Sequence, residues 1–161
     1  MPDDLLERAV AESRAQTALG LREALRNASP AVLRKLAVDL VPPLFRNEYR
    51  GEPAQSGDGW ADAIAQPRIP ALPSFLVRVH LGAFVLNEVE SLLAAMMVVH
   101  APQSALVIIG PPVVPDVRNA LGTVVPWLID MDGLIHLMMT AKVGVGTRIC
   151  EATHVDADYF R

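Results

Sequence analysis

The sequence predicts an α/β protein in which helices flank a central sheet, and three observations lead to this class. The continuous apolar run at 105–109 is typical of a strand that is buried on both faces. Helical patterns stand before and after this run, and further strand patterns alternate with them. Such alternation favours helices layered on a sheet through right-handed crossovers. With 161 residues and no internal repeat, we expect one domain over 1–161.

Two helices are predicted at the start of the chain. Residues 4–28 are rich in Ala, Leu, Glu and Arg, which makes 1–28 a helical lead into the domain. Ser29 is the expected N-cap of the second helix and Pro30 its first residue. We expect the proline pair at 42–43 to end this helix.

Strand patterns follow. Residues 47–59 are polar and contain glycine, which predicts a loop or a short edge strand, and 60–65 predict a short strand. Residues 75–81 alternate between two faces, and this alternation places Arg78 and His80 on the same face.

Helices and strands alternate in the second half of the chain. Asn87 is the expected N-cap of a helix with Glu90 at its third position, in a capping box. The remaining predictions are a strand at 105–109, a helix at 116–121, a strand at 124–129 and a helix at 132–140.

Composition excludes several classes of protein. The single cysteine, Cys150, rules out an internal disulfide and a cysteine-based zinc site. No apolar run reaches the roughly 18 residues of a membrane span, and the acidic N-terminus is unlike a signal peptide, so we expect a cytoplasmic location. A net charge of −4 argues against tight, sequence-independent DNA binding.

The sequence resembles the catalytic domain of the Mrr-type restriction endonucleases. The likeness runs from about residue 20 to the C-terminus through separated segments in the family's order: 25–40, the turn Gly57-Asp58-Gly59-Trp60-Ala61-Asp62, 89–97, 105–110, 128–134, and 143–146 with 156–160. The resemblance implies a restriction-endonuclease-like central mixed sheet flanked by helices. We expect no winged-helix DNA-reading domain in this chain.

The resemblance also implies a site for Mg²⁺-dependent phosphodiester hydrolysis, and most of its positions are substituted. Asp62 falls on the aspartate that binds the metal. Arg78 stands at the Gln or Glu position of the second ligand, His80 at the lysine position and Arg34 at that of a helical glutamate. Because an arginine donates hydrogen bonds and accepts none, Arg34 and Arg78 near Asp62 favour an Asp–Arg ion pair over a bound cation. We also expect Trp60 to pack inward or to cover the former cleft.

Three functions follow as alternatives. The first is a degenerate nuclease domain, inactive or impaired and without cofactor, that binds DNA weakly and salt-dependently or serves a protein partner in defence or repair. The second is an active Mg²⁺- or Mn²⁺-dependent endonuclease in which Asp62 combines with Glu48 or Glu52 and His80 replaces the lysine. The third is a protein-interaction or oligomerisation module, for instance a homodimer, without a DNA role.

Overall fold

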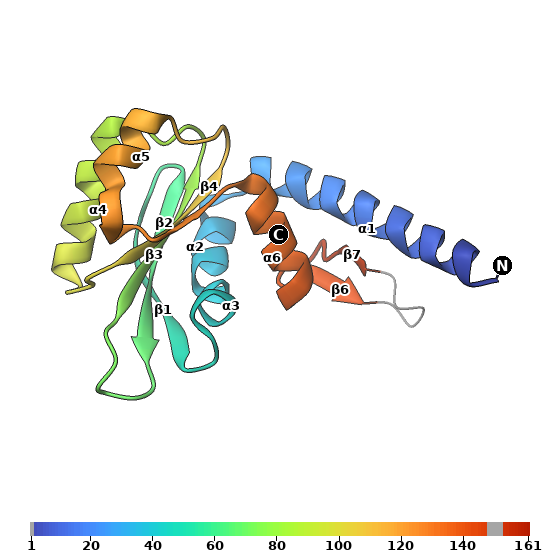
Figure 1. The fold of residues 1–161 in the computed structure, drawn as a ribbon, viewed down its shortest axis with the longest axis horizontal. Helices are drawn as coiled ribbons and strands as arrows, with labels where there is room; N and C mark the ends of the chain where they lie inside the picture. The colour runs from blue at the N-terminus through green and yellow to red at the C-terminus, as the bar shows by residue number, and fades with distance from the viewer. Residues whose placement is uncertain (1, 148–152) are drawn as a thin grey trace.

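The computed structural model describes residues 2–147 and 153–161 and contains a mixed sheet of five strands (Figure 1). The strand order is β1-β2-β3-β4-β5, so each strand lies beside its neighbour in the sequence. The pairs β1–β2 and β2–β3 are antiparallel, whereas β3–β4 and β4–β5 are parallel. The strands are β1 (Tyr49–Gly57), β2 (Trp60–Pro67), β3 (Phe75–Leu81), β4 (Ser104–Ile109) and β5 (Trp127–Ile129).

Helices cover both faces of this sheet, which confirms the predicted α/β class. One face carries α1 (Pro2–Arg26), α2 (Pro30–Asp39), α3 (Val41–Phe45) and α6 (Met131–Ala141). The other carries α4 (Leu86–Val98), α5 (Pro115–Leu121) and the short 3₁₀ helix η1 (Gly122–Val124). A small antiparallel pair, β6 (Val145–Thr147) with β7 (Thr153–Val155), lies beside α1, which extends away from the sheet in Figure 1.

Two apolar cores, one on each face, hold the layers together. The core beneath α2 and α6 contains the alternate residues of β2 and β3, among them Ala61, Ala63 and Val79. Small residues on β2 allow α2 to pack closely on the sheet. The core beneath α4 contains Leu76 and Leu106, which point to the opposite face. Every residue of β4 is buried, as the apolar run predicted.

The structure confirms the predicted start of α2 and corrects its predicted end. The Ser29 hydroxyl accepts a hydrogen bond from the Val32 amide at 3.3 Å, as expected of an N-cap. The proline pair does not end helical structure, because α3 follows α2 almost directly and contains both prolines. Pro42 and Pro43 lie in the first turn of α3, where a helix needs no amide donors and proline is therefore tolerated.

The N-terminus of α4 also differs from the prediction. Its N-cap is Val85 and not Asn87, and Glu88, not Glu90, occupies the third helical position. The Glu88 carboxylate accepts a hydrogen bond from the Val85 amide at 2.7 Å, which satisfies one free donor at the helix start. The helix therefore begins earlier than the sequence pattern suggested.

The remaining differences concern strands. The stretch predicted as a loop or short edge strand is the nine-residue strand β1, and β5 is shorter than expected because η1 occupies its predicted start. The β6–β7 pair was not predicted. Within the described residues, no helix is both long and apolar enough to cross a membrane.

Candidate functional site

Three of the four residues that the sequence resemblance places at catalytic positions, Asp62, Arg78 and His80, meet on the α4 face of the sheet. In the antiparallel register of β2 and β3, Asp62 lies opposite Arg78 and Trp60 opposite His80. Because alternate residues of each strand enter the core under α2, these four side chains belong to the opposite face. The predicted common face of Arg78 and His80 is thus confirmed.

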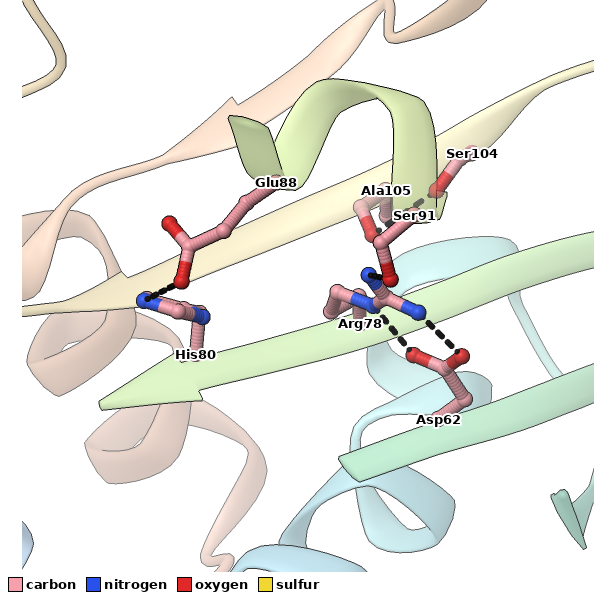
Figure 2. Close-up of polar contacts among 7 residues, drawn as sticks. All are labelled: Asp62, Arg78, His80, Glu88, Ser91, Ser104 and Ala105. Atoms are coloured by element: carbon pink, nitrogen blue, oxygen red, sulfur yellow. Dashed lines mark hydrogen bonds and ion pairs between the residues drawn. The ribbon is translucent and has the colours of Figure 1, made fainter. Parts of the chain in front are cut away.

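Asp62 and Arg78 form a buried, two-pronged ion pair (Figure 2). Arg78 Nε donates to Asp62 Oδ1 and a terminal guanidinium nitrogen donates to Oδ2, both at 2.7 Å. The two residues are only 3 % and 2 % exposed. This is the bidentate geometry in which arginine binds a carboxylate most strongly. Both carboxylate oxygens of Asp62 are therefore engaged by the guanidinium.

Two further residues complete the surroundings of Arg78. Its other terminal nitrogen donates to the hydroxyl of Ser91 on α4 at 3.1 Å. The guanidinium carbon lies 4.2 Å from the centre of the Trp60 ring, within the range of a cation–π interaction. Trp60 therefore packs inward over Arg78, as expected.

Burial and the ion pair act in opposite directions on Asp62. Burial raises the pKa of Asp62 above the usual aspartate value, and the hydrogen bonds and charge of Arg78 counteract part of this rise. Arginine itself keeps its charge in proteins, so the guanidinium always needs an acceptor in this buried place. Removal of either residue would thus leave the other buried without its ion-pair partner.

His80 is held by a second set of contacts. Its Nε2 lies 3.2 Å from Glu88 Oε1 (Figure 2). The same nitrogen lies 3.1 Å from the carbonyl oxygen of Ala83. Both neighbours are acceptors, so Nε2 carries a proton and donates it. The ring also meets Phe84 edge-on, with 5.2 Å between the ring centres. An Nε2 that is already a donor cannot take a proton from water, which removes this atom as a general base.

The sequence resemblance implies Mg²⁺ at this place, and the donor set does not fit that ion. Mg²⁺ prefers oxygen ligands in octahedral geometry, whereas the positions beside Asp62 hold a guanidinium and an imidazole. Asp62 would have to leave Arg78 unpaired in order to bind a metal. Within the described ranges, no three His, Cys, Asp or Glu side chains gather in a way that could hold a cation.

The structure does not bring Arg34 to this cluster. Arg34 is exposed on α2, and the buried side of that helix packs against the opposite face of the sheet. Of the acids proposed as alternative ligands, Glu52 is paired with Arg50 at 2.9 Å, and Glu48 is exposed just before β1.

Sequence reasoning missed the two α4 residues that contact the strand side chains. Neither Glu88 nor Ser91 is among the site residues that the sequence predicts. Residues three apart share one face of a helix, so this spacing was the available signal that both could face β3.

Comparison with known proteins supports the fold. The chain is similar to a solved structure of the DNA modification-dependent restriction endonuclease AspBHI, with a TM-score of 0.55 and 20 % sequence identity. The match covers 80 % of this chain but only 36 % of that one, so the chain spans about a third of the length of AspBHI. No protein-family model and no curated protein sequence matches the chain. At this identity the similarity establishes a restriction-endonuclease-like fold.

Proposed function

We propose that this chain is an Mrr-like, restriction-endonuclease-like domain that works with DNA but does not cut it. One observation carries the proposal: both oxygens of the Asp62 carboxylate are bonded to Arg78, at the place where a nuclease of this fold would hold its metal. The AspBHI similarity supports the fold, and the ordered sequence segments support the Mrr type.

Hydrolysis of a phosphodiester requires an activated water and a cation to stabilise the developing charge. Here the carboxylate is neutralised by a guanidinium, and His80 Nε2 is a donor between two acceptors. The pair is also almost fully buried, so a phosphodiester cannot reach Asp62 without displacing Trp60 or α4 side chains. These features support a scaffold whose former catalytic residues now stabilise the packing of α4 on the sheet.

We propose weak, salt-dependent association with DNA and not tight binding. The net charge of −4 gives the whole chain no favourable long-range attraction to phosphates. A nuclease-derived domain of this kind would act in defence or repair beside a protein that supplies sequence recognition or cleavage.

A plasmid assay tests this function. Folded protein is incubated with supercoiled plasmid, methylated and unmethylated, in Mg²⁺ and in Mn²⁺, beside Asp62→Asn. Asp58→Asn is the matched control, because Asp58 is exposed in the same hairpin and makes no contact with Arg78. The proposal expects no nicking by any of these proteins.

The contrary result would be metal-dependent nicking that disappears in Asp62→Asn and persists in Asp58→Asn. That outcome would establish the active, divergent endonuclease. Anisotropy of a labelled DNA duplex at low and at moderate salt tests the second half of the proposal. Absence of binding at low ionic strength would favour the interaction module without a DNA role.

A further inference from the structure

A second polar site lies on the α2 side of the sheet, away from the Asp62–Arg78 pair. It is a cavity of about 490 Å³, which we call the α2–β1 pocket. Segments far apart in the sequence form its walls: α2, the start of β1, the residue after β2, the turn after α6 and the C-terminal segment. The volume falls in the range of pockets that bind small molecules.

The α2–β1 pocket is lined by more basic than acidic residues, although the chain as a whole is acidic. Lys35, Arg50, Arg68 and Lys142 line it, and all four are exposed to solvent. Two acids, Asp39 and Asp156, also line it, so the lining carries two more positive than negative side chains. The chain as a whole carries a net charge of −4. Such a local excess of positive charge attracts an anion from solution.

The cations are positioned by contacts that leave them able to bind a ligand. The Arg68 Nε donates to the carbonyl of Asn47 at 2.9 Å, which fixes the guanidinium through one nitrogen only. Arg50 pairs with Glu52, but both side chains are well exposed, and such surface pairs contribute little free energy. Each contact engages one nitrogen of its guanidinium group, so the other nitrogens can still donate to a ligand.

Lys35 and Tyr159 both line the pocket and contact each other. The ammonium of Lys35 lies 4.0 Å from the centre of the Tyr159 ring, which orients the long side chain without neutralising its charge. Burial, and after it the negative charge of Asp39, raise the pKa of Tyr159. The phenol therefore keeps its proton beyond the pH at which a free tyrosine ionises.

We propose that the α2–β1 pocket binds a phosphate group. Two arginines and two lysines from four different segments line one cavity, and planar guanidinium groups match the oxygens of a phosphate. The proposal goes beyond the function given above and does not rest on it, because the pocket shares no residue with the Asp62–Arg78 cluster. The group can belong to a free phosphate ester or to a DNA backbone.

Calorimetric titration with pyrophosphate and with a 5′-phosphorylated dinucleotide at low ionic strength tests the proposal. The pocket variant is Lys35→Gln/Arg68→Gln. The matched control, Arg14→Gln/Arg118→Gln, removes the same charge from exposed residues outside the pocket. The pocket variant should bind at least about tenfold more weakly than the wild type, and the control should bind almost as the wild type does. Equal weakening in both variants, or no binding of either probe by the wild type, would overturn the proposal.

A DNA duplex distinguishes the two sources of phosphate. If duplex binding also falls in the pocket variant but not in the control, the pocket binds backbone phosphates. If only the small probes respond, its ligand is a free phosphate ester. The plasmid assay reports on cleavage independently, so failure of the non-cleaving function and failure of this pocket give different results.

Discussion

Replacing Arg78 with methionine is the most informative perturbation of the candidate site. Methionine keeps an unbranched apolar side chain but removes the guanidinium. The Asp62 carboxylate then loses both of its 2.7 Å hydrogen bonds while it remains buried beneath α4. Ser91 and Trp60 lose their contacts with the guanidinium as well.

The size of the effect follows from the charge that is left behind. Removing one partner of a buried ion pair costs about 3–5 kcal/mol. Asp62 can avoid being charged by taking up a proton, which at pH 7 costs about 4 kcal/mol for a group that titrates near 4 in the unfolded chain. These two figures agree, and they are a large part of the roughly 5–15 kcal/mol that stabilises a typical domain.

The same reasoning gives a pH dependence. Without Arg78, burial raises the pKa of Asp62 further above its unfolded value. An acid with a raised pKa in the folded state binds more protons there, so its contribution to stability is complete below pH ~4 and is lost as the pH rises. The difference in stability between wild type and Arg78→Met should therefore shrink as the pH falls from 7 towards 5, by at most about 1.4 kcal/mol for each unit of pH.

Urea unfolding followed by circular dichroism measures these differences. The double variant Asp62→Leu/Arg78→Met should recover most of the stability that Arg78→Met loses, because no buried charge remains. Arg34→Met, which alters an exposed arginine of α2, should change stability by less than about 0.5 kcal/mol. A loss below about 1 kcal/mol for Arg78→Met, or a double variant as unstable as the sum of its single variants, would refute the account.

Three further predictions concern the surroundings of the two sites. Glu88→Ala should lower the free energy of unfolding by about 1 kcal/mol, because the carboxylate caps α4 and contacts His80. Gly51→Ala should cost about 1–3 kcal/mol, since a Cβ there would lie 2.4 Å from a backbone oxygen of α2. Burial raises the pKa of both tyrosines, Tyr49 and Tyr159, so absorbance at alkaline pH should show neither ionising near the usual value of 10 until the protein unfolds.

Each of these has a contrary result. Wild-type stability in Glu88→Ala, measured by urea unfolding, would show that the cap does not contribute. An unchanged Gly51→Ala would mean that β1 can move away from α2. Tyrosinate absorbance near pH 10 in protein whose circular dichroism is still native would show that a tyrosine is accessible to solvent. The raised pKa values of the two tyrosines also predict that the free energy of unfolding declines as the pH rises above about 10. The reason is that the folded state keeps the phenol protons that the unfolded chain releases.

Much of the fold was predictable from local patterns. The alternation in β3 and the apolar run of β4 marked the sheet, and Ser29-Pro30 marked the start of α2. The errors lie where tertiary contacts decide the outcome. Valine is a poor N-cap, so local pattern favours Asn87, whereas α4 begins after Val85, whose amide donates to the Glu88 carboxylate.

The candidate site was predictable only in part. Alternation on one strand indicated that Arg78 and His80 share a face, and charge indicated an ion pair with Asp62. Sequence alone does not reveal which face a helix covers. The sequence resemblance placed Arg34 beside the pair, whereas α2 packs on the other side of the sheet. Helix α4 instead brings Ser91 to Arg78 and Glu88 to His80.

Nuclear magnetic resonance with Mn²⁺ tests most directly whether Asp62 is committed to Arg78 and not to a metal. Paramagnetic Mn²⁺ broadens the amide signals of nearby residues, so the measurement needs no DNA. The account predicts that the signals of 61–63 and 77–79 broaden no more than those of other buried residues as Mn²⁺ is added. Selective, saturable broadening of these signals that disappears in Asp62→Asn would contradict it, because Asp62 would then bind a metal.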